Sequence, residues 1–164
     1  MSSKEFDQIV KEEFDYLIKD YGFSLVKCKK VGAGYEILFK NKTTGVKIDY
    51  EFREAYIFVT IYRLRNGKLV ENPRYIKPDS VIHGFSLDDI LALRNPQAIV
   101  RPAYEYPADS EFYDPVRGLT LYVRKFAQNL REYASELLEG DFRLFDKLEP
   151  IVRERALRLE NSVS

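Results

Sequence analysis

The sequence predicts an α+β fold in which one antiparallel sheet lies between an N-terminal helix and C-terminal helices. Residues 23–71 alternate apolar and polar side chains between recognisable turns, which is typical of a β-meander of four to five strands. Apolar side chains on either side of this stretch recur every three or four residues, as in amphipathic helices. Six of the seven prolines lie within residues 73–115 and predict a long irregular segment before the last helices. Residues 1–164 are expected to form a single domain, because the length is that of one ordinary domain.

The first predicted element is a helix that ends near Gly22, a residue suited to the left-handed position that follows many helices. Charged side chains cover one side of this helix, and apolar side chains at helical spacing form the other. The apolar face consists of Phe6, Ile9, Val10, Phe14, Leu17 and Ile18. We therefore expect the helix to pack on the sheet.

Four strands are predicted at about residues 23–31, 35–40, 46–53 and 55–64. The third has the cleanest period of two: Val46, Ile48, Tyr50 and Phe52 are expected to face the core and Lys47, Asp49, Glu51 and Arg53 the solvent. Both faces of the fourth strand are apolar, which predicts that it is covered on both sides. Asn66-Gly67 favours a type I′ turn, so a fifth strand is expected to follow it and to end at about residue 71.

Three helices are predicted beyond the meander. A short helix over residues 87–94 has Ser86 as its N-cap and two aspartates in its first turn. Residues 97–114 are expected to form an ordered loop across the domain. Helices over residues 115–139 and 142–158 follow, and Pro150 is expected to interrupt or restart the second.

The composition excludes several classes of function. The 26 Lys and Arg balance the 26 Asp and Glu, but residues 21–77 carry twelve bases against five acids and residues 78–116 two against seven. This asymmetry either steers a partner or is neutralised across the surface. One histidine and one cysteine cannot form a zinc or iron site, and there is no glycine-rich phosphate loop, so no cofactor or metal is expected. A lone cysteine, no leader and no apolar run of membrane length predict a cytoplasmic protein.

A segment rich in tyrosine, acids and proline, residues 101–114, is the first candidate site. Tyrosine provides a large contact area at little entropic cost, and acids steer a basic partner. Tyr104, Glu105, Tyr106 and Tyr113 are therefore predicted to bind an unidentified protein partner. The alternative is that these rings seal the core beneath an irregular loop. Because no catalytic motif is present, a non-enzymatic function through protein–protein binding is favoured.

Two other functions and one oligomeric state stay open. Single-stranded nucleic acid could bind six lysines interleaved with aromatic residues: Lys27, Lys29, Lys30, Lys40, Lys42 and Lys47. The sequence pI of about 6.6 makes nucleic acid the less favoured partner. His83 could act as a general base in a small-ligand enzyme, because imidazole titrates near neutrality. A homodimer could form at an edge strand, either the first strand or the one after Asn66-Gly67.

Two groups of residues carry a resemblance to known proteins. They are Phe14-x-x-Leu17 with Tyr21-Gly22-Phe23, and Leu137-Leu138-x-Gly140-Asp141-Phe142 with Val152-Arg153-Glu154-Arg155. In size and layout the chain resembles uncharacterised bacterial α+β proteins similar to small immunity proteins and antitoxin-like accessories. The resemblance implies a binding role, immunity-like or regulatory, without catalysis, and it assigns no functional residue.

Overall fold

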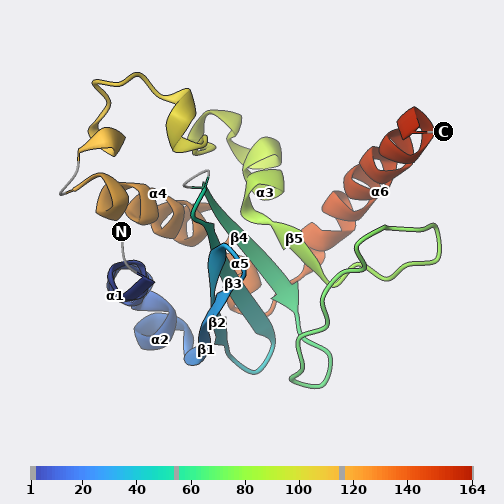
Figure 1. Ribbon diagram of the computed structural model, residues 1–164. Helices are drawn as coiled ribbons and strands as arrows, with labels where there is room; N and C mark the ends of the chain where they lie inside the picture. Colours follow the sequence, from blue (N-terminus) through green and yellow to red (C-terminus); the bar gives the residue numbers. More distant parts are fainter. Residues whose placement is uncertain (1–2, 54–55, 115–116, 164) are drawn as a thin grey trace.

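The computed structural model describes residues 3–53, 56–114 and 117–163, and within them one antiparallel sheet of five strands (Figure 1). The strands pair in chain order: β1 (Ser24–Val31), β2 (Gly34–Lys40), β3 (Thr44–Glu51), β4 (Tyr56–Arg63) and β5 (Gly84–Ser86). Along β3 the predicted period of two is confirmed on the core side, where Val46, Ile48 and Tyr50 are buried. Lys47 and Asp49, expected to face the solvent, are instead half-buried. The α+β fold and the meander predicted from the sequence are therefore confirmed.

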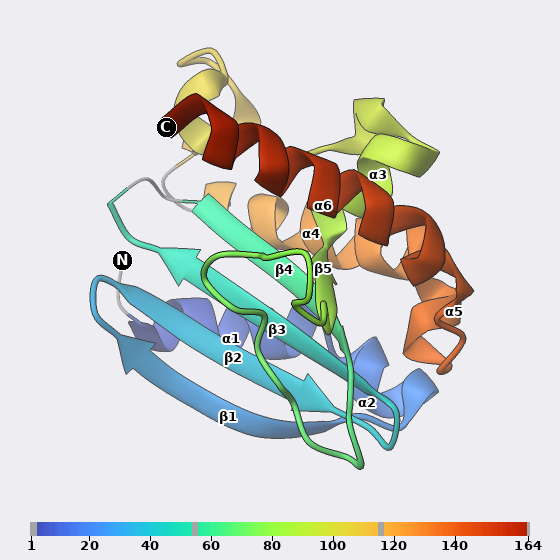
Figure 2. The same ribbon diagram turned by 90° about the vertical axis from the view of Figure 1, so that its right-hand side faces the viewer.

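One face of the sheet packs against helices from both ends of the chain (Figures 1 and 2). These helices are α1 (Ser3–Glu13), α2 (Tyr16–Tyr21) and α4 (Gly118–Tyr133). The ring of Phe6 stacks on that of Tyr50 with their centroids 4.6 Å apart. Gly22 follows α2 with a φ of 70°, as predicted, but the single predicted N-terminal helix is divided into α1 and α2.

Of the remaining helices, one matches its prediction and two differ mainly in where they are interrupted. Helix α3 (Leu87–Arg94) has the predicted bounds, and the Ser86 hydroxyl accepts a hydrogen bond from the Asp89 amide at 3.1 Å. The helix predicted over 115–139 is divided into α4 and α5 (Ser135–Leu138), while residues 115–116 lie outside the described part of the chain. Helix α6 (Arg143–Val163) continues through Pro150, where an interruption was expected. Short 3₁₀ turns divide the irregular segment: η1 (Pro96–Ala98), η2 (Ala103–Glu105) and η3 (Glu111–Tyr113).

The fifth strand comes from a different segment than the one expected. Asn66 and Gly67 have φ of 53° and 76°, as a type I′ turn requires, but a single bridge between Arg65 and Lys68 is the only pairing beside them among the described residues. The edge of β4 is instead paired by β5, with Tyr62 opposite Gly84. A Cβ atom at position 84 would lie 2.5 Å from the Tyr62 ring, so glycine allows this close pairing.

The other face of the sheet is crossed by a loop, residues 64–83, which runs in front of the strands in Figure 2. Tyr62 and Leu64 are buried on this side, and the Lys47 ammonium contacts a Glu71 carboxylate oxygen at 2.7 Å. From the end of this loop the chain enters β5, while α6 extends away from the sheet toward the C-terminus (Figure 1). No helix in the described ranges is both long and apolar enough to cross a membrane.

Candidate protein-binding groove

A groove with a volume of about 740 Å³ lies between the loop at residues 74–77 and the C-terminal half of α6. We call it the α6 groove. Its lining from the loop is Arg74, Tyr75, Ile76 and Lys77, and its lining from the helix is Val152, Arg155, Ala156, Leu159 and Glu160. The surface between the charged residues is therefore apolar.

The apolar part of the groove follows from helical geometry. Val152, Ala156 and Leu159 are separated by four and three residues, so their side chains share one side of α6. Val152 is 8% exposed, whereas Leu159 is 63% exposed and Tyr75, on the opposite wall, is 72% exposed. Apolar side chains this exposed on both sides of a groove are typical of an interaction site.

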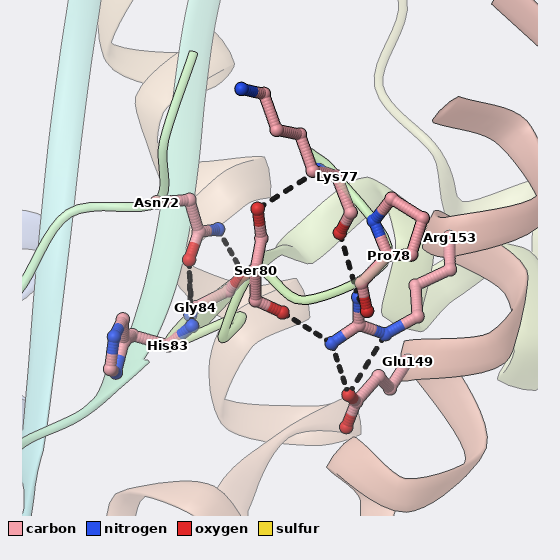
Figure 3. Close-up of polar contacts among 8 residues, drawn as sticks. All are labelled: Asn72, Lys77, Pro78, Ser80, His83, Gly84, Glu149 and Arg153. Carbon is pink, nitrogen blue, oxygen red and sulfur yellow. Dashed lines mark hydrogen bonds and ion pairs between the residues drawn. The ribbon is translucent and has the colours of Figure 1, made fainter. Parts of the chain in front are cut away.

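Arg153 fixes the loop wall of the groove to α6 (Figure 3). Its guanidinium donates hydrogen bonds to the backbone carbonyls of Ser80 at 2.5 Å, Lys77 at 3.3 Å and Pro78 at 3.4 Å. The same group also donates to a Glu149 carboxylate oxygen at 2.8 and 3.0 Å. Because the guanidinium spans a loop and a helix, it fixes the Lys77 end of the loop wall relative to α6.

A second set of contacts orders the loop from within. The Asn72 amide oxygen accepts from the backbone amide of His83 at 2.7 Å, and its nitrogen donates to the carbonyl of Gly84 at 2.8 Å (Figure 3). The Ser80 hydroxyl accepts from the Lys77 amide at 2.9 Å. Hydrogen bonds thus hold the chain just before the loop wall, at Asn72, and at its end, at Lys77, which restricts the freedom of the residues between them.

The rim of the α6 groove is more basic than acidic. Arg155 forms a bidentate pair with Asp89 of α3, at 2.7 and 3.0 Å. Arg74 lies over the Tyr75 ring, and neither Arg74 nor Lys77 pairs with a carboxylate in the ranges the structure describes. Against these cations the lining has one acid, Glu160. The rim therefore favours an acidic ligand.

The predicted tyrosine site lies elsewhere: in Figure 1 residues 101–114 lie on the other side of α3 from α6. Tyr104 is 62% exposed and Glu105 is exposed. Tyr106 is half-buried: its ring lies 4.6 Å from that of Phe112, and its hydroxyl accepts from the Arg101 amide at 3.0 Å. The side chain of Tyr113 lies outside the described part. Tyr106 and Phe112 thus cover the core, and Tyr104 presents its ring to solvent.

The six lysines of the nucleic-acid alternative do not form one basic stripe. Lys27 pairs with Glu36 at 2.8 Å, and Lys47 lies 2.7 Å from Glu71 and 3.8 Å from Asp49. Lys29, Lys30 and Lys42 are exposed, and Lys40 is half-buried. Because the carboxylates are on the same face as the paired lysines, less positive charge is available to phosphates.

Neither His83 nor Cys28 is in a catalytic arrangement. The His83 Nδ1 atom accepts from Arg65 Nε at 3.3 Å, and partial burial and the Arg65 charge lower its pKa. In the described part of the chain no carboxylate or hydroxyl group bonds to this imidazole. The Cys28 thiol donates to Asp7 at 2.8 Å, and burial and this bond raise its pKa, so the reactive thiolate is disfavoured.

The first strand offers a poor edge for the predicted homodimer. A bulge between Leu25 and Lys27 disturbs its register, and lysines follow along the strand. Bulges and lysines are devices that prevent strands of two molecules from pairing. Residues 68–71 form no strand, so the second suggested edge is absent.

Asp49 makes the stability of the fold depend on pH. Burial, with Glu36 and Glu71 nearby, raises its pKa to about 6, despite the opposing charge of Lys47. The folded state therefore binds more protons than the unfolded state between about pH 4 and 6, and this residue lowers stability as pH rises through that range.

We expect Asp49→Asn to increase the free energy of unfolding by about 1 kcal/mol at pH 7.5 and to leave it unchanged at pH 4. This value is reduced for screening, because the side chain is 35% exposed. Urea unfolding at both pH values measures this change in the free energy of unfolding. Asp109→Asn, on an exposed loop, is the matched control. Destabilisation at pH 7.5 would contradict the assignment.

The sequence did not reveal the α6 groove. The spacing of Val152, Ala156 and Leu159 is visible in the sequence, but it equally fits a helix face that packs on the core. A further signal for the groove was Tyr75-Ile76 between Pro73 and Pro78. Two adjacent apolar residues in a proline-rich loop indicate contact with another part of the protein or with a ligand.

Within the described residues, no group of three or more His, Cys, Asp and Glu side chains could hold a metal ion. Comparisons with protein-family models, with curated proteins and with solved structures found no match to this chain. The function is therefore inferred from the geometry of the groove.

Proposed function

We propose that this chain is a non-enzymatic binding protein that holds a segment of a protein partner in the α6 groove. The observation that carries the proposal is an ordered groove with apolar walls and two rim cations, Arg74 and Lys77, that have no carboxylate partner among the described residues. Fixed apolar pockets with a charged rim provide affinity from burial and orientation from charge.

The proposed role is immunity-like or regulatory, in the cytoplasm of a bacterium. A lone Cys28 fits a reducing compartment, since no internal disulfide is possible. A protein that covers a segment of its partner can block that partner without chemistry of its own. The resemblance in layout to small immunity and antitoxin-like proteins supports the same role.

Affinity capture from a lysate of the native host tests the proposal with two matched variants. The groove variant Ala156→Glu/Leu159→Glu places two carboxylates on the α6 wall of the groove. The control variant Ile151→Glu/Leu157→Glu adds the same charge to exposed positions of α6 outside the groove. Neither variant removes a fully buried side chain, so both are expected to fold.

We expect at least one protein to be captured equally by the wild type and the control, and at least tenfold less by the groove variant. Calorimetry with that purified protein should reproduce the difference. If every captured protein is retained by the groove variant, the α6 groove is not the binding site.

A further inference from the structure

We infer that the occupant of the α6 groove is an acidic amphipathic helix of the partner protein, about two turns of which lie along α6. This inference rests on the proposed function and specifies the chemistry of its ligand. Three observations support it: the length of the α6 wall, the hydrogen-bonded backbone groups of the loop, and the positive charge of the rim.

The length of the groove corresponds to two helical turns. Its helical wall runs from Val152 to Glu160, and a rise of 1.5 Å per residue makes this about 12 Å. Ala156 lies in the middle of this wall, between the larger side chains of Val152 and Leu159. A small residue at the centre leaves a hollow, into which a side chain of a second helix can insert as helices do when they pack.

The Lys77 end of the loop wall offers little to an extended peptide. A peptide that adds a strand requires free backbone groups on its host. There the carbonyl of Lys77 already accepts from Arg153, and the amide of Lys77 already donates to Ser80 (Figure 3). The carbonyls of Pro78 and Ser80, just beyond the groove lining, also accept from Arg153. A helix satisfies its own backbone groups, so it gains from the apolar walls without needing those of the loop.

The charge of the rim determines the charge of the helix. Arg74 and Lys77 are both exposed, so carboxylates that flank the apolar residues of a helix can pair with them. A second copy of α6 would fit less well, because residues 152–160 contain three arginines and two glutamates. The partner helix is therefore expected to have apolar residues at positions i, i+3 or i+4, and i+7, and at least two Asp or Glu beside them.

Selection from a displayed library of random 14-residue peptides tests this inference without a known partner. Peptides are selected on the wild-type protein and depleted on Ala156→Glu/Leu159→Glu. We expect the enriched sequences to show helical spacing and acidic residues. A representative peptide should gain helical circular dichroism on binding, and proline at its centre should weaken binding at least 30-fold.

The other outcomes separate the two proposals. Enriched peptides that are basic, or that tolerate central proline, would overturn the helix while leaving the groove as a binding site. If no peptide distinguishes the wild type from the groove variant, both the helix and the groove proposal fail. If the protein pairs with itself through α6, sedimentation would show a dimer that the groove variant abolishes, and the partner helix would be wrong.

Discussion

Replacing Arg153 with methionine is expected to separate the loop wall from α6 and to weaken binding in the α6 groove at least tenfold. Methionine keeps much of the aliphatic length but leaves the carbonyls of Lys77, Pro78 and Ser80 without the guanidinium. The arginine side chain is 28% exposed, so these bonds are partly shielded from water. We expect the free energy of unfolding to fall by about 2 kcal/mol, as for hydrogen bonds to a charged group.

Arg158→Met is the matched control for this substitution. Arg158 is on the same helix, its side chain is 78% exposed, and its ion pair is with Glu154 one turn away. An exposed pair of this kind contributes about 0.5 kcal/mol or less. Amide hydrogen exchange of residues 74–80 should rise with Arg153→Met alone. Equal exchange in the two variants would mean that Arg153 does not hold the loop.

Asn41→Ala is expected to have the largest effect on stability, a loss of about 3 kcal/mol. The Asn41 amide nitrogen donates to the carbonyls of Tyr21 at 3.1 Å and Leu138 at 3.0 Å. Its oxygen accepts from the amides of Thr43 at 3.0 Å and Thr44 at 2.8 Å. One side chain thus joins α2, the β2–β3 turn and α5, and alanine leaves several backbone groups without partners.

Calorimetry should show a melting temperature lower by about 6–12 °C for Asn41→Ala, from the usual scaling for a domain of this size. Lys42→Ala, at the next and exposed position of the same turn, serves as the control and should change it little. A shift of the same size in both variants would attribute the loss to the turn backbone rather than to the amide.

Local patterns predicted those parts of the fold that local physics determines. The alternation of Val46, Ile48 and Tyr50 identified the buried face of β3, because successive strand residues point to opposite faces. Ser86 identified the start of α3, because its hydroxyl satisfies an amide that the helix leaves free. The Asn66-Gly67 turn was also correct in its backbone angles.

The remaining features depend on residues distant in sequence. A type I′ turn does not determine whether the segments on either side of it pair as strands. Here β4 pairs with β5 instead, and Gly84 can lie opposite Tyr62 because it has no side chain. Likewise the groove exists because Arg153 reaches carbonyls more than seventy residues earlier in the chain. Neither contact can be predicted from periodicity within a short window of the sequence.

A second binding surface, made of Tyr104, Glu105, Tyr106 and Tyr113, remains a prediction.

A reciprocal exchange of charge tests the central claim, that the α6 groove binds an acidic helix, most directly. Titration calorimetry compares the wild type and Arg74→Glu/Lys77→Glu, each with a selected acidic peptide and with the same peptide carrying Lys for Glu. Lys29→Glu/Lys30→Glu, exposed on β1, controls for net charge. The account predicts that either exchange alone weakens binding at least tenfold and that both together restore it to within threefold. Binding that ignores the rim exchange, or that weakens equally in the β1 control, would contradict it.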